Sequence, residues 1–371
     1  MQYPRVKLGD VCDILDYKRR PITKKDRIPG MIPYYGATGI VDYVKNYIFD
    51  EPLVLLGEDG AKWSGGDISA FEISGKTWVN NHAHVLRPHS ELYSKWLVQY
   101  LNFADLSNYI TGVTVPKLNQ ERMCMIELPL PPLPVQQEII ARLEKELGKV
   151  DEMANGFRRM AELADEEFKS VLSETFEHVE GKSVKLGDVC DCCLGKMLDK
   201  SKNKGKLHRY LRNVNVRWGA FDLEDVLEMR FEDDEHERYG LKNGDIVMCE
   251  GGEPGRCAIW REEESGMLFQ KALHRIRPSK AFLSEYLYFL FMSYSYNGIF
   301  HERFVGTTIY HLTGQVLKEL PVTVCSIENQ QKIIGNLSLA ETNKNSLKTE
   351  SEHGLSLCME LRKSILQEAF A

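Results

Sequence analysis

Residues 134–178 read PVQQEIIARLEKELGKVDEMANGFRRMAELADEEFKSVLSETFEH, and this stretch decides the architecture of the chain. Its apolar residues recur in alternating steps of three and four, the spacing typical of a coiled-coil seam. The seam comprises Ile140, Leu143, Leu147, Val150, Ala154, Phe157, Ala161, Ala164, Phe168, Val171 and Thr175. At about 1.5 Å per residue such a helix is roughly 70 Å long. Because this exceeds the core of one small domain, the helix is predicted to be a spacer.

A second copy of this helix ends the chain. Residues 168–176 (FKSVLSETF) match 362–370 (RKSILQEAF), and 136–140 (QQEII) match 330–334 (QQKII), both at an offset of 194. The chain is therefore an internal duplication. The second copy has Lys344, Ser351 and Gly354 near seam positions, so it is expected to be bent or looser there.

The opening of the chain is also repeated. Residues 6–13 (VKLGDVCD) recur unchanged as 184–191, where they directly follow the long helix. If the copies are equivalent, the helix ending at Ala371 supplies the missing neighbour of the first copy, and the termini lie close together. We therefore expect a pseudo-two-fold arrangement of α/β (α+β) domains with two antiparallel helices. The expected boundaries are 1–133 and 181–325 for the domains, and 134–180 and 326–371 for the helices.

Within the two domains the frame is shared and the inserts differ. Residues 54–60 (VLLGEDG) match 246–252 (IVMCEGG), and 80–88 match 270–278. Residues 17–50 and 195–243 cannot be aligned, and residues 33–39 are expected to form a turn-rich loop. A duplicated scaffold with divergent inserts indicates two copies of one activity directed at two different targets.

The composition is that of a soluble chain with two or three domains. Of its 371 residues, 27% are charged and 43% hydrophobic. No apolar run reaches the roughly 18 residues of a membrane span, and the N-terminus has no signal-like apolar core, so we expect a cytoplasmic protein without a membrane partner. The nine cysteines lie mostly in apolar runs, which favours reduced, buried thiols over disulfides.

The charge distribution matters more than the total. The net charge of −7 argues mildly against nucleic acid. However, residues 18–27 carry a net charge of +5 and residues 196–212 carry +6, whereas 222–237 carry −8. Local patches determine what a surface attracts. One basic run is equally well explained as a solvated loop, but two in matching places of a duplicated chain favour binding.

Motifs of cofactor and metal sites are incomplete. Residues 75–77 (GKT) match the tail of a phosphate-binding loop, but Ala70 stands in place of the leading glycine, so a hairpin turn is favoured. The cysteines at 190, 192 and 193 have no second pair at zinc-ribbon spacing, which favours structural thiols. There is no glycine-rich loop of the kind that binds S-adenosylmethionine.

Two further patterns leave alternatives open. His82 and His84 share one face of an expected strand, but only His84 has a counterpart, His274, so a common metal centre is disfavoured. They are either polar residues near a binding face or packing histidines. Residues 16–18 (DYK) match the tail of a nuclease motif, but the pattern is too short to be specific. The chain is expected to bind rather than react, with no catalytic residue and no metal.

Three stretches carry a family resemblance: residues 128–140 (LPLPPLPVQQEII), residues 112–118 with the pattern GxTxPKL, and residues 78–85 (WVNNHAHV). With their duplicates they closely resemble the specificity (S) subunit of type I restriction-modification systems, over essentially the whole chain. The second copy departs from the pattern, because residues 321–326 (PVTVCS) lack the proline pair and 313–315 (TGQ) replace 119–121 (NQE).

The resemblance implies two target recognition domains, each reading one half of a bipartite, asymmetric site in double-stranded DNA. It also implies that the helices fix the spacing and dock two methyltransferase (M) subunits, through which restriction (R) subunits join. S-adenosylmethionine, ATP and Mg²⁺ would act in those partners, leaving this chain non-catalytic and without a cofactor. Two alternatives remain: a pseudo-symmetric scaffold without a DNA role, and the specificity chain of a fused or orphan modification enzyme.

Three sets of residues are assigned on this basis. Base or loop contacts are predicted where the copies align but present different groups: Glu58, Asp59, Lys62, Trp63, Thr114, Lys117, Glu250, Arg256, Thr308, Tyr310 and His311. Phosphate contacts are predicted in the basic runs: Lys18, Arg19, Arg20, Lys24, Lys25, Lys200, Lys202, Lys204 and Lys206. Methyltransferase docking is predicted at the shared helix ends, although these could equally join the two helices: Phe168, Leu172, Phe176, Ile365, Leu366 and Phe370.

Overall fold

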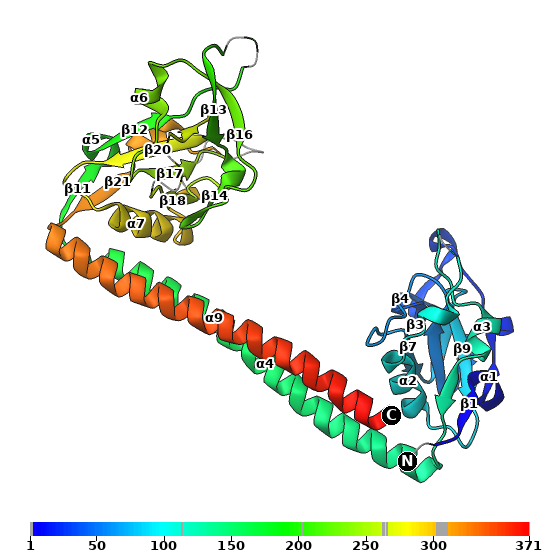
Figure 1. Cartoon of the computed structure of the whole chain (residues 1–371). Helices are drawn as coiled ribbons and strands as arrows, with labels where there is room; N and C mark the ends of the chain where they lie inside the picture. Colours follow the sequence, from blue (N-terminus) through cyan, green and yellow to red (C-terminus); the bar gives the residue numbers. More distant parts are fainter. Residues whose placement is uncertain are drawn as a thin grey trace. The chain divides into compact units, whose positions relative to one another are not determined.

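The computed structural model describes residues 3–112, 114–199, 201, 203–261, 264, 266–301 and 311–370. It divides into two compact units, which are residues 1–157 with 352–371 (the first unit) and residues 158–351 (the second unit). Each unit contains one globular domain and a part of each long helix (Figure 1). None of the helices in the described ranges has the length and apolar content of a membrane-spanning segment.

The first unit is built on two sheets. The central one is antiparallel, with the order β2 (Cys12–Ile14), β9 (Ala83–Pro88), β6 (Leu53–Gly57) and β7 (Ala70–Ile73). The other has the order β4 (Gly39–Val44), β3 (Pro29–Gly36), β8 (Lys76–Val79) and β5 (Phe49–Asp50). A separate pair is formed by β1 (Arg5–Lys7) and β10 (Glu127–Pro129). The short helices are α1 (Leu8–Val11), α2 (Ser94–Phe103), α3 (Gln120–Cys124), η1 (Asp16–Lys18), η2 (Lys24–Asp26) and η3 (Ser107–Tyr109).

Strand β6 is buried on both faces, and its alternate residues contribute to two cores. Val54 and Leu56 belong to the cluster that contains Trp96 of α2. Leu53 and Leu55 belong to the cluster that contains Phe49 of the other sheet. Successive side chains of a strand point to opposite faces, so an uninterrupted apolar run is needed here.

The second unit repeats the central sheet with the same order. Its strands are β12 (Cys190–Leu194), β20 (Leu273–Pro278), β17 (Ile246–Cys249) and β18 (Cys257–Ile259). The pair β11 (Lys182–Lys185) and β21 (Pro321–Val324) corresponds to β1 and β10. The insert forms β13 (Lys206–Leu211), β14 (Val216–Arg217), β15 (Ala220–Phe221) and β16 (Leu227–Phe231), and β19 (Leu268–Phe269), outside the insert, pairs in parallel with β13. The short helices are α5 (Leu186–Val189), α6 (Glu235–Tyr239), α7 (Ser284–Tyr296), α8 (Gly314–Lys318) and η4 (Asn213–Asn215).

The expected division into a shared frame and divergent inserts is confirmed. The central sheets have the same topology, and β13 pairs antiparallel with β16 and parallel with β19, as β3 does with β4 and β8. The inserts differ in their connections, because a short turn joins β3 to β4, whereas η4, β14 and β15 lie between β13 and β16. The prediction of a turn-rich loop over residues 33–39 was wrong, because residues 33–36 belong to strand β3. In this strand Tyr34 is buried and pairs with Trp78, so burial of the aromatic ring overrides the local turn composition.

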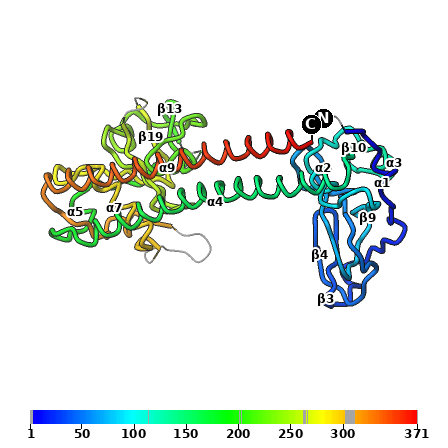
Figure 2. Tube along the Cα trace, turned by 90° about the horizontal axis from the view of Figure 1, so that it is seen from below, coloured from blue at the N-terminus to red at the C-terminus, as the bar shows by residue number. Residues whose placement is uncertain are grey.

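Two long helices run through the units: α4 (Leu133–Glu177) and α9 (Ile327–Phe370) (Figures 1 and 2). In the first unit, Arg142 pairs with Glu368 and Asp151 with Arg362, so partner numbers fall as α4 advances. In the second unit Lys348 Nζ lies 3.0 Å from Asp165. Within each unit the helices are therefore antiparallel neighbours, as predicted.

The helix seam is packed where looseness was expected. The ring of Phe157 lies against Gly354, and a Cβ atom there would be 2.4 Å from the ring. The ammonium of Lys344 lies 4.2 Å from the centre of the Phe168 ring, and Ser351 is buried. Helix α9 is continuous through all three positions. The departures from the apolar pattern therefore allow close packing, because a small residue or a cation faces an aromatic ring.

Each long helix is fixed to its domain by a buried glutamine near its start. Gln136 accepts a hydrogen bond from Tyr93 N–H and donates to the carbonyls of Glu91 and Pro131. Gln330 makes the equivalent bonds with Leu283 N–H and with the carbonyls of Ala281 and Cys325. Both side chains are fully buried. The repeated QQ-x-II motif is thus a joint between helix and domain.

The residues predicted to dock a methyltransferase subunit face the chain's own domains. Phe168, Leu172 and Phe370 are at most 7% exposed, and the prediction is wrong for them. The other three residues are partly buried. Phe176 packs against the hydrophobic core of the second unit, and Ile365 and Leu366 pack against that of the first. The repeated apolar pattern at the helix ends therefore reflects attachment of each helix to a domain.

The attachment is the same in both copies. The Phe176 ring packs edge-on against Tyr286 of α7, and the Phe370 ring packs against Trp96 of α2. Tyr286 and Trp96 occupy the same position in their helices, two residues after the starting serine. The end of α9 and residues 3–5 line a common cleft. The helix end therefore lies beside the start of the chain, as the duplication predicted.

Candidate nucleic-acid interface

In the first unit, three loops meet at one end of the central sheet. Glu58 directly follows β6, and His82 directly precedes β9. In the third loop, Thr111 and Lys117 exchange two backbone hydrogen bonds. Glu58 N–H donates to His82 O, and Leu118 N–H donates to Glu58 O, both at 2.8 Å. These bonds fix the backbone from which the predicted base-contacting residues project.

The second unit builds the same junction. Glu250 N–H donates to Ala272 O at 2.9 Å, and Leu312 N–H donates to Glu250 O at 2.8 Å. His274 Nε2 donates to the carbonyl of Leu312 at 2.7 Å, and burial lowers the pKa of this imidazole. His84 Nε2 makes the matching bond to Leu118 O, also at 2.7 Å. Both histidines therefore join the third loop to the sheet. Of the two alternatives for His84, this arrangement favours a packing histidine over a residue of a binding face.

A network of charged side chains lies beneath the loops of the first unit. Asp16 contacts both His84 Nδ1, at 2.5 Å, and Arg19, at 3.3 Å. Glu58 pairs with Arg19 and with Lys117, whose Nζ lies 2.7 Å from the carboxylate. Burial opposes ionisation of Glu58, but the bonds from Lys117 and Arg19 outweigh burial and hold its pKa below the usual value. The cluster is a set of compensated charges that holds the loops in place.

The same cluster contains the ligand atoms of a conceivable metal site. Oxygen and nitrogen atoms of Asp16, Glu58 and His84 lie within 4.8 Å of one another. However, Arg19 contacts both carboxylates, and Lys117 adds a second cation. A divalent ion here would face two positive side chains at the donor atoms, so the residues do not fit a metal.

The Glu58→Gln variant tests this network. The substitution removes the carboxylate from two cations and is expected to lower the free energy of unfolding at pH 7 by about 2 kcal/mol. Because the pKa of Glu58 is lower in the folded chain, its contribution is present above the unfolded value near 4.5 and is lost as the pH falls through the folded value. The difference from wild type should therefore shrink at pH 4.

Urea unfolding followed by tryptophan fluorescence at pH 7 and pH 4 measures this effect. Glu121→Gln, at an exposed carboxylate in the same domain, is the matched control. Equal stability of the two variants at both pH values would contradict the role assigned to Glu58.

The structure separates the predicted contact residues by exposure. Lys62 and Thr114 are exposed on the loops of the first unit, Asp59 is partly exposed and bonded to His82, and Lys117 is partly exposed. Trp63 is 7% exposed, and its indole N–H donates to Gly57 O at 3.0 Å. Its ring fills the core beneath the loop, so we withdraw it from the set of base contacts. Glu58 is 8% exposed and its carboxylate is bound by Arg19 and Lys117, so we withdraw it as well.

The second unit offers fewer described candidates. His311 is exposed, and Glu250 is partly buried. Arg256 is partly buried and bonds Glu253 and the carbonyl of Asn213, which orients its guanidinium. Thr308 and Tyr310 lie outside the described residues.

Most of the predicted phosphate contacts are exposed. In the first unit, Arg20, Lys24 and Lys25 are exposed, and Lys18 is partly exposed. In the second unit, Lys204 and Lys206 are exposed, whereas Lys200 and Lys202 lie outside the described residues. Arg19 is the exception, because its guanidinium bonds Asp16, Glu58 and the carbonyl of Ala83. A side chain held in this way is not available to a phosphate, and we withdraw Arg19.

Sequence reasoning missed an apolar surface on the first insert. Met31, Val41 and Tyr43 of the β3–β4 hairpin are 87%, 52% and 51% exposed. Exposed apolar groups on a hairpin offer contacts to thymine methyl groups and sugars as well as to protein. The alternation in residues 40–44 (IVDYV) could have indicated a hairpin with one exposed apolar face.

Comparison with known proteins identifies the family. The model of the type I restriction modification DNA specificity domain matches residues 2–152 and 178–354. S.HindORF215P of Haemophilus influenzae, which bears the name of a type I restriction enzyme specificity subunit, is 28% identical over 95% of this chain and 90% of its own length. The EcoKI specificity subunit of Escherichia coli is 21% identical over 91% of this chain and 79% of its own.

Solved structures agree on the fold. A chain from work on complex assembly and conformational transition of the type I R-M system has a TM-score of 0.78 at 16% identity, covering 100% of this chain and 97% of that one. The HsdS subunit from Thermoanaerobacter tengcongensis has a TM-score of 0.61 at 15% identity, covering 100% and 96%. The two matched domains and the two-copy fold lead to one conclusion: this chain belongs to the specificity subunit family of type I restriction-modification systems.

Proposed function

We propose that this chain is the DNA-recognition subunit of a type I restriction-modification complex, and that each domain reads one half of a bipartite, asymmetric duplex site. The observation that carries the proposal is the repeated loop junction. The same backbone bonds surround Glu58 and Glu250, but the side chains and inserts around them differ. A common frame with different polar groups suits the reading of two unlike sequences.

Exposed lysines and arginines would supply sequence-independent contacts. Arg20, Lys24 and Lys25 in the first unit, with Lys204 and Lys206 in the second, are exposed on the inserts that carry the divergent surfaces. Each phosphate neutralised by such a group releases counterions and makes binding salt-dependent. These contacts would set the register of the duplex, and the loop residues would read base edges.

A groove of about 780 Å³ in the first unit is our candidate for docking a methyltransferase subunit. It runs between the end of α9 and the loop before β7, and its apolar lining includes Ile68, Phe103, Met359 and Leu366. Ile68 and Met359 are 75% and 67% exposed. Large exposed apolar side chains that gather in a groove are typical of protein interfaces.

Met359→Ser is expected to weaken association with the cognate methyltransferase subunit about tenfold, because it removes an apolar anchor from the groove. The measurement is biolayer interferometry with immobilised chain. Met31→Ser removes an even more exposed methionine from the β3–β4 hairpin and should leave this association unchanged. Equal loss in both variants would place docking elsewhere.

We further propose that the chain is non-catalytic and acts in the cytoplasm. S-adenosylmethionine, ATP and Mg²⁺ would act in methyltransferase and restriction subunits. A fused modification enzyme would instead show activity in the isolated chain with Mg²⁺ and S-adenosylmethionine.

Fluorescence anisotropy tests the DNA role. The chain, with its cognate methyltransferase subunit, is titrated into labelled random duplexes at several salt concentrations. We expect log K to fall linearly with log salt concentration. Absence of duplex binding at every salt concentration would favour the scaffold alternative.

A further inference from the structure

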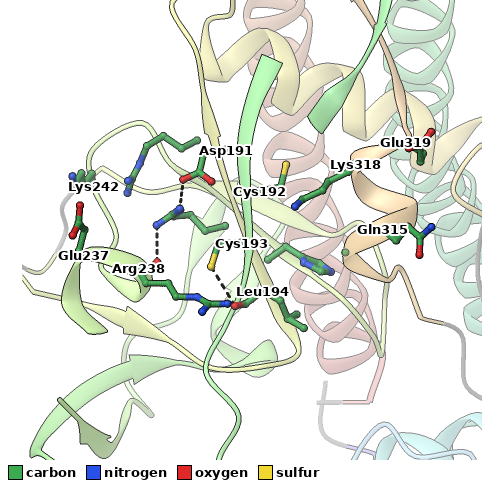
Figure 3. Close-up of a pocket in the computed structure, with 14 residues that line it drawn as sticks. Asp191, Cys192, Cys193, Leu194, Glu237, Arg238, Lys242, Gln315, Lys318 and Glu319 are labelled. Carbon is green, nitrogen blue, oxygen red and sulfur yellow. Dashed lines mark hydrogen bonds and ion pairs between the residues drawn. The ribbon is translucent and has the colours of Figure 1, made fainter. Parts of the chain in front are cut away.

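A cleft of about 790 Å³ in the second unit concentrates positive charge (Figure 3). It lies between β12, the end of α6 and α8. The charged residues that line it give a net charge of +2. Five are cationic: Arg238, Lys242, Arg275, Arg277 and Lys318. Three are carboxylates: Asp191, Glu237 and Glu319.

The carboxylates leave part of this charge unbalanced. Glu319 pairs with Lys185, outside the cleft, at 2.6 Å, and Asp191 pairs with Arg275. Arg277 is neutralised by the buried Asp245, which bonds it at 2.7 Å. In the part of the chain that the structure describes, no carboxylate pairs with Lys242 or Lys318. Both lysines are exposed, so their ammonium groups can turn toward a ligand in the cleft.

Arg275 forms the inner wall and retains an unused donor. Its side chain is 3% exposed. One terminal nitrogen bonds Asp191, and the other donates to Arg238 O at 2.7 Å. The Nε–H is buried and has no acceptor among the described residues. A buried donor without an acceptor is costly, and because this nitrogen has almost no accessible surface, an anionic oxygen in the cleft would bond it only after a shift of the Arg275 side chain.

The first unit has an apolar or neutral residue at two of these positions, whereas Arg277 corresponds to Arg87. Arg275 corresponds to Val85, because β20 and β9 pair with their neighbours in the same register. Val85 is fully buried in an apolar core. Lys318 corresponds to Cys124, since each lies against the glycine of the repeated LGDV turn, Gly187 or Gly9. The shared frame therefore does not require a cation at Arg275 or Lys318, and these two belong to the second copy alone.

We propose that this cleft is a binding site for a phosphate group. Arginine and lysine together provide the directed donors and the mobile charge that phosphate oxygens accept. Two sources share this chemistry: a backbone phosphate of DNA held by the second domain, which rests on the function proposed above, and the phosphate of a free nucleotide or inorganic ion.

The first experiment uses inorganic phosphate. The melting temperature of the full chain is measured against phosphate concentration, with chloride at equal ionic strength as the reference. Phosphate should stabilise the wild type, and Lys318→Gln should raise the concentration needed for half the effect about tenfold. Lys280→Gln, an exposed lysine outside the cleft, removes the same charge and should match the wild type. Arg275→Val, the residue of the first copy, should also weaken the effect.

The second experiment identifies the source. The salt dependence of duplex binding is measured for the chain with its methyltransferase subunit. A fall of about 1 in the slope for Lys318→Gln, but not for Lys280→Gln, would assign the site to a DNA phosphate. An unchanged slope with phosphate stabilisation retained would assign it to a free anion. Absence of phosphate stabilisation, together with an unchanged slope, would overturn the site, whereas failure of the wild type to bind duplexes would count against the proposed function alone.

Discussion

Replacing Phe370 with alanine is expected to lower the free energy of unfolding of the first unit by about 3–5 kcal/mol. The ring is 7% exposed and lies 4.8–5.6 Å, centre to centre, from the rings of Trp96, Phe103 and Tyr100. Its loss leaves a cavity between α9 and α2, and the aromatic contacts add to the cost of lost burial. The end of α9 should then separate from its domain.

Urea unfolding gives the loss of stability, and limited proteolysis reports release of the last turns of α9. Met359→Ala, at an exposed position on the same helix, is the control and should change the free energy by at most about 0.5 kcal/mol. Phe176→Ala should have a similar but smaller effect in the second unit, because its ring is only partly buried. If Phe370→Ala matched its control, the attachment of α9 through this ring would be wrong.

The variants Gln136→Ala and Gln330→Ala are each expected to destabilise the chain by about 3 kcal/mol. Each substitution leaves one backbone N–H and two carbonyl groups without their buried partner. An unsatisfied buried polar group costs about 1–3 kcal/mol, and water that enters the small cavity reduces this cost. The two effects should be close to equal, because the two sets of bonds are equivalent.

Gln137 and Gln331 provide matched controls one residue further along each helix. Both are exposed, so their replacement by alanine should change stability by no more than about 0.5 kcal/mol. Chemical unfolding of all four variants measures the comparison. A loss at Gln136 without a loss at Gln330 would contradict the equivalence of the two joints.

The architecture could be predicted from the sequence because each element of one copy could be compared with its counterpart in the other copy. The seam residues Ile140, Leu143 and Val150 are buried, and the repeated motif at Gln136 and Gln330 makes the same contacts in both copies. A long helix depends on local periodicity, which a sequence displays directly.

The individual site residues were harder to predict because their surroundings come from distant parts of the chain. Trp63 follows a loop but turns into the core. Arg19 belongs to a basic run but meets Glu58, 39 residues away. The apolar helix ends suggested a partner, but Phe370 contacts Trp96 of its own chain. Exposure and pairing depend on tertiary packing, which neither composition nor spacing encodes.

The cationic cleft around Arg275 was also not predicted from the sequence. Arg275 and Lys318 are far apart in sequence, and nothing in a local window distinguishes them from solvated cations. The sequence alignment of residues 80–88 with 270–278 already pairs Val85 with Arg275, and the structure confirms this pairing and adds that of Cys124 with Lys318.

The most direct measurement of the central claim is selection from a random duplex library by the chain together with its cognate methyltransferase subunit, followed by sequencing of the retained DNA. The account predicts two unlike short motifs at one fixed spacing, because two domains with a common frame present different side chains. Retention of DNA without a preferred sequence, or of a single motif repeated symmetrically, would contradict it.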